Sequence, residues 1–378
     1  MTDLERTVEF VRRKFADFYT AQSEVGPSSI GQREFGFGSW ERKIETRHAA
    51  FPTKADLRKY LVMNAPFFIS HSIAYYEFPT GRPMPRKNWL GGDLVFDLDA
   101  DECPNHAKGW ICDTCFGKTK SEAIKLIEEF LMPDFGFSSN EISVNFSGNR
   151  GFHVRVESEK VKQLDREARR DLVDYIGGTG LSIENFFRAK EKSWMENDRV
   201  KRQLQNMGPK PTDPGWGGRI ARFAIDPANI AHLPKEVQKK KFPLFTQGVK
   251  EGNWDKVRIA NKETVWGDLG KKVGVHMGDQ IDQNVTIDTS KLIRMADSLH
   301  GDSGWVAKTF PLSQLQSFDP RKDALAFSSS ETVTLNIVEA PKFLSREEEF
   351  GPFKAEKREL PLHAAMYLLC KKAALLSD

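Results

Sequence analysis

Two carboxylates at alternate positions of one predicted strand are well suited to bind divalent cations. In the segment LVFDLDAD, residues 94–101, Asp97 and Asp99 alternate with apolar residues. Because side chains along a strand repeat with a period of two, both carboxylates lie on one face. Hard oxygen ligands favour Mg²⁺ or Mn²⁺, and such sites commonly serve phosphoryl transfer. The alternative is a strand end with solvated acids, since D-x-D is a frequent pattern and Asp93 and Asp101 share this parity.

A second cluster of metal-ligand types follows at once, with the spacing C-x2-H-x5-C-x2-C. Its members are Cys103, His106, Cys112 and Cys115. Three of the four cysteines of the chain therefore lie within thirteen residues, which in an intracellular protein favours metal over disulfide. Three thiolates and an imidazole form a tetrahedral set typical of one structural zinc. The fourth cysteine, Cys370, lies in an apolar helical stretch and is expected to be a buried thiol.

A glycine-bearing turn, FSGNRGFHV, carries three side chains that can contact phosphate. Ser147 and Arg150 lie in the turn, and His153 follows it. Glycine lets the backbone approach an anion, and an arginine can contact phosphate oxygens through two donors. The alternative is an ordinary hairpin turn with one exposed arginine.

The segment IDQNVTIDTSKLIRMADSLHG supplies two further carboxylates, Asp282 and Asp288, and two further cationic candidates, Arg294 and His300. A two-metal site usually needs a carboxylate from a neighbouring strand. Both aspartates qualify by chemistry, and spacing alone does not bring these distant residues to one site.

Composition limits the class of protein that must position these residues. The chain has 378 residues, 29% of them charged and 39% hydrophobic, as in soluble globular proteins. It contains no long apolar run and no signal-peptide pattern, so we expect a cytoplasmic protein without a membrane segment. A net charge of +3 permits a nucleic-acid partner only if basic residues gather on one face.

Hydrophobic periodicity predicts an α/β (α+β) fold with mixed strand pairing. We expect helices over residues 1–22 and 54–63, another after Thr119 or Ser121, and strands at DLVFDLDA, ISVNF, NVTID, WVAKTFPL and ETVTLNIV. The predicted domains are a catalytic core (1–157 and 261–345), a polar, helical insertion (158–260) and a helical C-terminal segment (346–378). The basic clusters of the insertion are typical of a solvated helical surface.

Taken together, the motifs resemble the archaeo-eukaryotic primase superfamily, and most closely the small catalytic subunit of DNA primase. The resemblance rests on their order: REFGF, TRHAAF, LVFDLDAD, the Cys/His cluster, DFGF, SGNRGFH and LIRMADSLHG. It covers roughly residues 30–155 and 280–305. It implies an RRM-like core with a zinc knuckle over residues 103–115 and an attached helical subdomain.

The resemblance also implies roles for individual residues. Asp97, Asp99 and Asp282 match the ligands of two Mg²⁺ or Mn²⁺ ions; Asp282 is chosen because of its distance from Arg294 and His300 in the family pattern, and Asp288 is the fallback. The implied nucleotide-binding set is Arg47, Ser147, Arg150, His153, Arg294 and His300. One departure is Asn149, which occupies a position that is arginine in eukaryotic relatives.

The function that follows is template-directed synthesis of short primers on single-stranded DNA from nucleoside triphosphates. The implied partners are a large primase subunit, in a heterodimer, and the replication machinery. One alternative is a single-chain primase-polymerase, or the polymerase of an end-joining ligase, from the same superfamily. The alternative of another class is a non-catalytic, zinc-containing nucleic-acid-binding protein.

Overall fold

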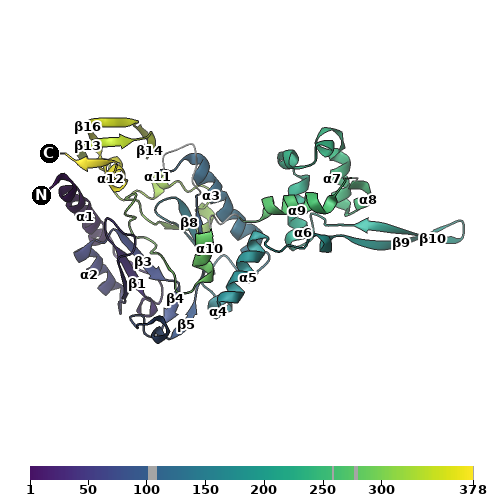
Figure 1. Ribbon diagram of the computed structural model, residues 1–378, viewed down its shortest axis with the longest axis horizontal. Helices are drawn as coiled ribbons and strands as arrows, with labels where there is room; N and C mark the ends of the chain where they lie inside the picture. Colours follow the sequence, from purple (N-terminus) through teal and green to yellow (C-terminus); the bar gives the residue numbers. More distant parts are fainter. Residues whose placement is uncertain (101–108, 258, 276–279, 378) are drawn as a thin grey trace. The chain divides into compact units, whose positions relative to one another are not determined.

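The computed structural model describes residues 1–100, 109–257, 259–275 and 280–377 (Figure 1). The chain divides into two compact units. Unit 1 comprises residues 1–124, 138–170 and 277–378, and unit 2 comprises residues 125–137 and 171–276. None of the described helices has the length and apolar character needed to cross a membrane.

Two four-stranded sheets form the centre of unit 1. The first has the order β11 (Leu292–Arg294), β3 (Phe68–Ser72), β1 (Phe35–Gly38), β2 (Thr46–Ala49). The second has the order β12 (Thr309–Phe310), β7 (Ile142–Phe146), β8 (Gly151–Val156), β6 (Leu94–Asp99). Every pair in both sheets is antiparallel, so the expectation of mixed pairing is wrong for the described strands.

Smaller sheets complete the strands of unit 1. These are β4 (Ala74–Tyr76) with β5 (Trp89–Gly92), β14 (Phe343–Ser345) with β15 (Glu348–Phe350), and the triplet β16 (Phe353–Pro361), β13 (Thr332–Ala340), β17 (Ala374–Leu376). The C-terminal segment was expected to be helical, but only α12 (Leu362–Cys370) is, and strands occupy most of the rest.

The helices of unit 1 are α1 (Asp3–Ala21), α2 (Lys54–Asn64), α3 (Asp113–Lys125), α4 (Glu159–Lys162), α10 (Gln280–Ile287), α11 (Pro320–Asp323) and α12. The first two confirm the predicted helices. Thr2 caps α1 in a reciprocal capping box with Glu5, and Val11, Phe15 and Tyr19 form its buried stripe.

Helix α10 replaces a strand that was predicted for residues 284–288. Its β-branched residues favour a strand by propensity, but tertiary contacts decide otherwise. Thr286 is buried, and its hydroxyl donates to the Val95 carbonyl at 2.7 Å. Val285 packs against a buried cluster of Ile73, Val95 and Ile293. The helix is therefore held directly against β6, the strand that carries the paired carboxylates.

Unit 2 combines helices with a long hairpin. The helices are α5 (Arg166–Gly177), which begins within unit 1, α6 (Gly215–Ile225), α7 (Phe242–Glu251), α8 (Trp254–Val257) and α9 (Lys262–Val273). The hairpin consists of β9 (Arg188–Glu196) and β10 (Arg199–Met207), in a stretch expected to be wholly helical. Its turn, Asn197 and Asp198, has positive φ at both residues, as a tight two-residue hairpin turn requires.

Candidate active site

Strand β6 presents both predicted carboxylates to one cavity. Asp97 pairs in register with His153 of β8, and Asp99 pairs with Gly151. Leu98 and its apolar neighbours are buried, whereas Asp97 and Asp99 are partly exposed, as the period of a strand predicts. Both aspartates line a cavity of about 220 Å³ within unit 1.

The cavity brings together most of the candidate residues. Its polar lining consists of Lys43, Ser70, Asp97, Asp99, Ser147, Asn149, Arg150, His153, Arg294 and His300. These residues come from both four-stranded sheets and from the segments between their strands. Segments as distant in sequence as β6 and β11 therefore contribute to one site, which spacing alone could not establish.

The turn at residues 147–150 is shaped by Gly148 within it and Gly151 directly after it. Gly148 has φ +87°, and a Cβ there would lie 2.8 Å from the His300 Cβ. A Cβ on Gly151 would collide with the Asp99 carboxylate and the Leu98 carbonyl. The Ser147 hydroxyl oxygen accepts the Gly151 N–H at 3.0 Å, so its own O–H can still donate. The glycines thus permit the close approach of the turn to both His300 and Asp99.

Both histidines of the site are held neutral. Burial, together with the charges of Arg155 and Arg294, lowers the pKa of His153 to about 3. Burial likewise lowers the pKa of His300 well below its ordinary value. At neutral pH each ring is therefore a neutral hydrogen-bonding group.

Hydrogen bonds to the Nδ1 atoms assign the tautomer of each ring. The Asn145 amide donates to His153 Nδ1 at 3.3 Å, and the Asp302 N–H donates to His300 Nδ1 at 3.1 Å. Each Nδ1 is thus an acceptor, and the hydrogen resides on Nε2. His153 Nε2 lies 3.4 Å from an Asp97 carboxylate oxygen, so His153 orients this carboxylate.

Three cations contribute the positive charge of the cavity: Lys43, Arg150 and Arg294. Burial raises the pKa of Asp99, and the charges of Arg150 and Lys43 oppose that shift. Arg150 lies 4.0 Å from Asp99. Burial lowers the pKa of Arg294 to about 10, so it remains protonated at neutral pH. Lys43 belongs to the segment between β1 and β2 and was not predicted, because no motif marks it.

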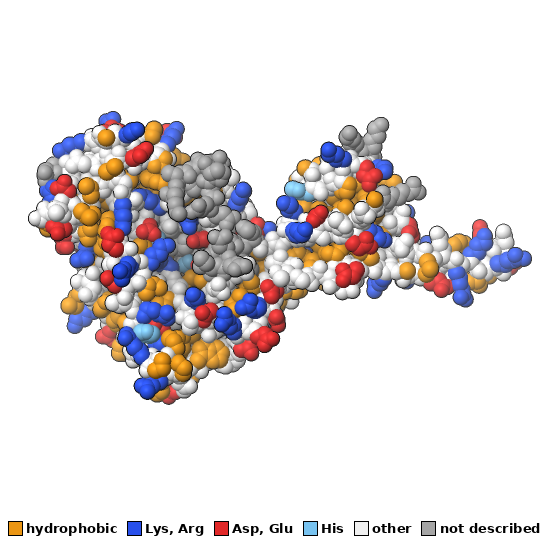
Figure 2. Space-filling model, in the orientation of Figure 1, with side chains coloured by type: hydrophobic (Ala, Val, Ile, Leu, Met, Phe, Trp, Pro, Cys, Tyr) orange, Lys and Arg blue, Asp and Glu red, His pale blue; other side chains and the backbone are white. Residues whose placement is uncertain are grey.

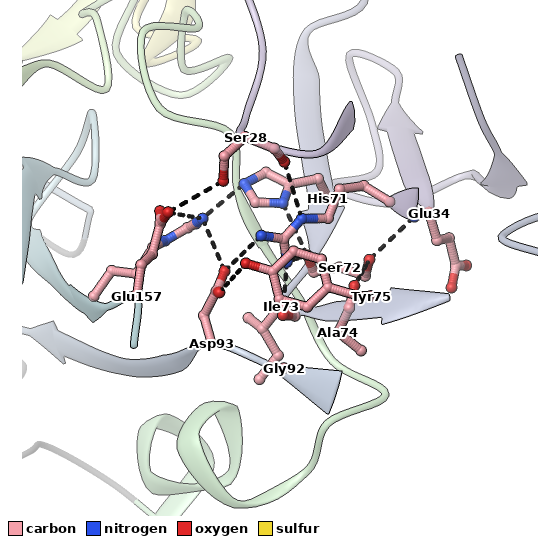
Figure 3. A network of polar contacts seen from close by, with 12 residues as sticks. Ser28, Glu34, His71, Ser72, Ile73, Ala74, Tyr75, Gly92, Asp93 and Glu157 are labelled. Atoms are coloured by element: carbon pink, nitrogen blue, oxygen red, sulfur yellow. Dashed lines mark hydrogen bonds and ion pairs between the residues drawn. The ribbon is translucent and has the colours of Figure 1, made fainter. Parts of the chain in front are cut away.

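A buried ion network fixes the strands behind the cavity (Figure 3). Asp93, immediately before β6, accepts hydrogen bonds from Arg33 at 2.7 Å, Arg155 at 3.3 Å and the Tyr75 hydroxyl at 2.5 Å. Arg155, on β8, also lies 3.1 Å from His71 Nε2 on β3. The network therefore ties the second sheet to the first.

Arg47 lies outside the residues that line the cavity. Its guanidinium contacts both oxygens of the buried Glu34, at 3.0 and 3.3 Å, and donates to the Ser290 carbonyl at 3.0 Å. The structure thus shows Arg47 joining β2 to its neighbours rather than facing the two aspartates.

The third carboxylate is not placed by the structure. The backbone of Asp282 belongs to α10, and its side chain lies outside the described residues. Asp288 accepts hydrogen bonds from the Ser290 N–H at 2.9 Å and hydroxyl at 2.7 Å, and it is not among the residues lining the cavity. Among the described side chains, no group of three or more His, Cys, Asp or Glu is arranged to hold a metal.

Half of the predicted zinc set is described. The sulfurs of Cys112 and Cys115 lie 3.4 Å apart at the beginning of α3, whereas Cys103 and His106 lie outside the described residues. Two thiolates on one zinc, each about 2.3 Å from the metal, are about 3.8 Å apart in tetrahedral geometry. The described sulfurs are slightly closer than this, so sharing one metal would require them to move apart by a few tenths of an ångström.

A lysine from the C-terminal part of the chain reaches the turn at residues 147–150. Lys371, which follows α12, donates to the Asn149 side-chain oxygen at 3.1 Å and to the Gly109 carbonyl at 2.6 Å. Burial lowers its pKa to about 8. A cation thus lies beside Asn149. Lys371 was not predicted, because more than two hundred residues separate it from the turn in sequence.

Comparison with known proteins agrees with this site. The family profile described as DNA primase small subunit matches residues 96–310. The DNA primase small subunit PriS of Methanosarcina acetivorans is 33% identical over 98% of this chain and 97% of its own length. That of Methanothrix thermoacetophila is 33% identical, covering 97% and 98%, and that of Halorubrum lacusprofundi is 32% identical, covering 85% of each. The chain therefore belongs to the DNA primase small subunit family and is a primase nucleotidyltransferase.

Proposed function

We propose that this chain synthesises short primers on single-stranded DNA by two-metal-ion nucleotidyl transfer from nucleoside triphosphates. The observation that carries the proposal is the convergence, in one cavity, of the β6 carboxylate pair with a glycine-bearing turn and three cations. A pair of carboxylates alone would repel a triphosphate. A site that bound phosphate through cations alone would not need the carboxylates. A site with both suits a metal-bound polyphosphate.

Asp97 and Asp99, with Asp282 as the third carboxylate, would hold two Mg²⁺ or Mn²⁺ ions. Such ions lower the pKa of an attacking hydroxyl and stabilise the pyrophosphate leaving group. The chemistry needs no protein nucleophile, because the attacking group is the 3′-hydroxyl of the growing strand.

The remaining cavity residues would bind and orient the triphosphate. Arg150, Arg294 and Lys43 offset its charge, and Ser147 donates from its hydroxyl. His153 and His300 act as neutral Nε2–H groups, His153 by orienting Asp97. Arg47 would join this set only by exchanging its contacts with Glu34 for phosphate oxygens, since its guanidinium is otherwise engaged.

The family membership supports partners for this reaction. Because the relatives are named as small subunits, we propose a heterodimer with a large primase subunit, acting on single-stranded template with the replication machinery inside the cell. The single-chain alternatives of the superfamily predict full activity without any partner. Primer synthesis by this chain alone, compared with synthesis after addition of a large subunit, separates the two arrangements.

The principal test is Asp97→Ala, assayed by incorporation of labelled nucleotide on single-stranded template with Mg²⁺ or Mn²⁺. We expect loss of incorporation with an unchanged circular dichroism spectrum. Asp17→Ala, which removes an exposed carboxylate on α1, is the matched control and should retain activity. Incorporation by Asp97→Ala at the wild-type rate would refute the assignment. The same assay on Asp282→Ala and Asp288→Ala identifies the third carboxylate, which we expect to be Asp282.

We also propose one structural Zn²⁺ on Cys103, His106, Cys112 and Cys115. Elemental analysis should return about one zinc per chain. Cys112→Ser should lose the metal, whereas Cys370→Ser should retain it, because Cys370 is buried in α12. A stable, fully folded wild-type chain without zinc would contradict this proposal.

A further inference from the structure

The β9–β10 hairpin of unit 2 exposes almost all of its side chains. It is paired along its full length, from Arg199 opposite Glu196 to Met207 opposite Arg188. Beyond its base it extends away from the helices of unit 2 (Figure 1). Two hydrogen bonds from Asn206 to Asp255, at 2.7 and 3.2 Å, fasten that base to α8. The hairpin is thus anchored at one end while both of its faces remain accessible.

The register divides the hairpin side chains into two faces of different chemistry. Residues directly opposite each other project to the same side, and successive residues alternate. The face that we name the basic face consists of Arg188, Lys190, Lys192, Trp194, Glu196, Arg199, Lys201, Gln203, Gln205 and Met207. The opposite face, which we name the apolar face, consists of Ala189, Glu191, Ser193, Met195, Val200, Arg202, Leu204 and Asn206.

Positive charge is concentrated on the basic face. It carries five cations and one acid, Glu196, which pairs with Lys201 at 2.5 Å. Among the described residues, none of the other four cations forms an ion pair. On the apolar face, by contrast, Arg202 and Glu191 pair at 3.2 Å and cancel. The excess charge of the hairpin therefore lies on one face. Figure 2 shows Lys and Arg side chains of the hairpin among acidic and apolar ones.

The spacing and the aromatic residue of this face fit a polyanionic strand. Cations at alternate positions of a strand recur about every 7 Å, so the face is a row rather than a point of charge. Trp194 is 39% exposed within that row. Binding of single-stranded nucleic acid combines such a row with an aromatic ring on which a base can stack.

We propose that the basic face of the hairpin binds the phosphate backbone of single-stranded nucleic acid, with Trp194 stacking on a base. The identification of that strand as the primase template rests on the proposed function, but the binding itself does not. A protein partner would instead use Met195, Val200 and Leu204 on the apolar face, where each side chain is more than 60% exposed.

The test is fluorescence anisotropy of the full chain with a labelled oligothymidine of about thirty nucleotides, titrated at several salt concentrations. The triple variant Lys190→Gln, Lys192→Gln, Lys201→Gln should weaken binding. The negative slope of log affinity against log salt should become shallower by about 2, or about 0.7 for each lost contact. Trp194→Ala should weaken binding about tenfold with little change in slope.

Two controls separate this face from general charge loss. The variant Lys235→Gln, Lys250→Gln, Lys271→Gln removes the same charge from exposed positions outside the hairpin and should keep the wild-type slope. Met195→Ser, Val200→Ser, Leu204→Ser should also bind normally. Equal slopes for the two lysine triples, or loss of binding only in the apolar-face variant, would overturn the inference. Incorporation on a saturating template is measured in parallel: absence of synthesis by the wild type refutes the proposed function and leaves the binding result intact.

Discussion

Asp93→Asn should be among the most destabilising single substitutions in unit 1. The side chain of Asp93 is 2% exposed, and it is the carboxylate shared by Arg33, which is fully buried, and Arg155. Asparagine keeps the volume and one acceptor but removes the charge. The buried Arg33 would then remain desolvated without its counter-ion, and Arg155 would keep only Glu157, at 3.8 Å. Breaking a buried pair by removing one partner costs about 3–5 kcal/mol, and the retained acceptor places our expectation near 3 kcal/mol.

Equilibrium urea unfolding at neutral pH measures this loss as the change in midpoint multiplied by the slope. Glu331→Gln is the matched control: its carboxylate pairs with Lys14 at 2.5 Å but is 46% exposed, so it should cost at most about 1 kcal/mol. Adding Arg33→Met to Asp93→Asn should cost less than the sum of the two single losses, because the second change removes a cation already left unpaired. A loss for Asp93→Asn no larger than that of Glu331→Gln would refute the reasoning.

Three further outcomes are expected. Gly151→Ala should lower nucleotide incorporation strongly, because its Cβ would displace the Asp99 carboxylate; a variant with wild-type kinetics would contradict that view of the turn. Hydrogen bonds from Ser138 and Ser158 lower the pKa of Glu141 to about 2, so its stabilising effect is full above the unfolded pKa and is lost as pH falls toward 2. The cost of Glu141→Gln in urea unfolding should therefore be smaller at about pH 4 than at about pH 7. Asp97→Asn should raise the affinity for nucleotide measured in the presence of a chelator, and it should abolish the increase in affinity that Mn²⁺ causes. An equal fall in the affinities measured with chelator and with Mn²⁺ would count against the metal role.

The parts of the site that sequence predicts are those set by local geometry. The period of a strand places Asp97 and Asp99 on one face, and the two glycines mark a turn that approaches other groups closely. The sequence does not predict the cations that distant segments of the chain bring to the site. Lys43 and Lys371 lie in segments without a motif and reach the site only through long-range packing. Their positions depend on the whole of unit 1 rather than on their neighbours.

Local propensity misleads at two elements for different reasons. At α10, tertiary contacts of Val285 and Thr286 outweigh the strand preference of β-branched residues. At the hairpin, abundant charge suggested solvated helices, although Asn197-Asp198 is a two-residue turn signal. The hairpin could therefore be predicted from its turn residues, whereas no local sequence signal predicts helix α10.

The cavity has carboxylates on one side and cations on the other, which we name the carboxylate wall and the cationic wall, and two neutral histidines lie among these charged groups. Asp97 and Asp99 lie on β6, while Arg150 and Arg294 come from the turn and from β11, and Lys43 from the segment after β1. Divalent ions placed on the carboxylate wall would bridge it to the phosphates held by the cationic wall, so metal and nucleotide affinities are coupled reciprocally. A protonated His153 beside Asp97 would compete with metal for that carboxylate. Burial lowers the pKa of His153 to about 3, so at neutral pH the neutral ring would leave the β6 carboxylate free to bind such an ion.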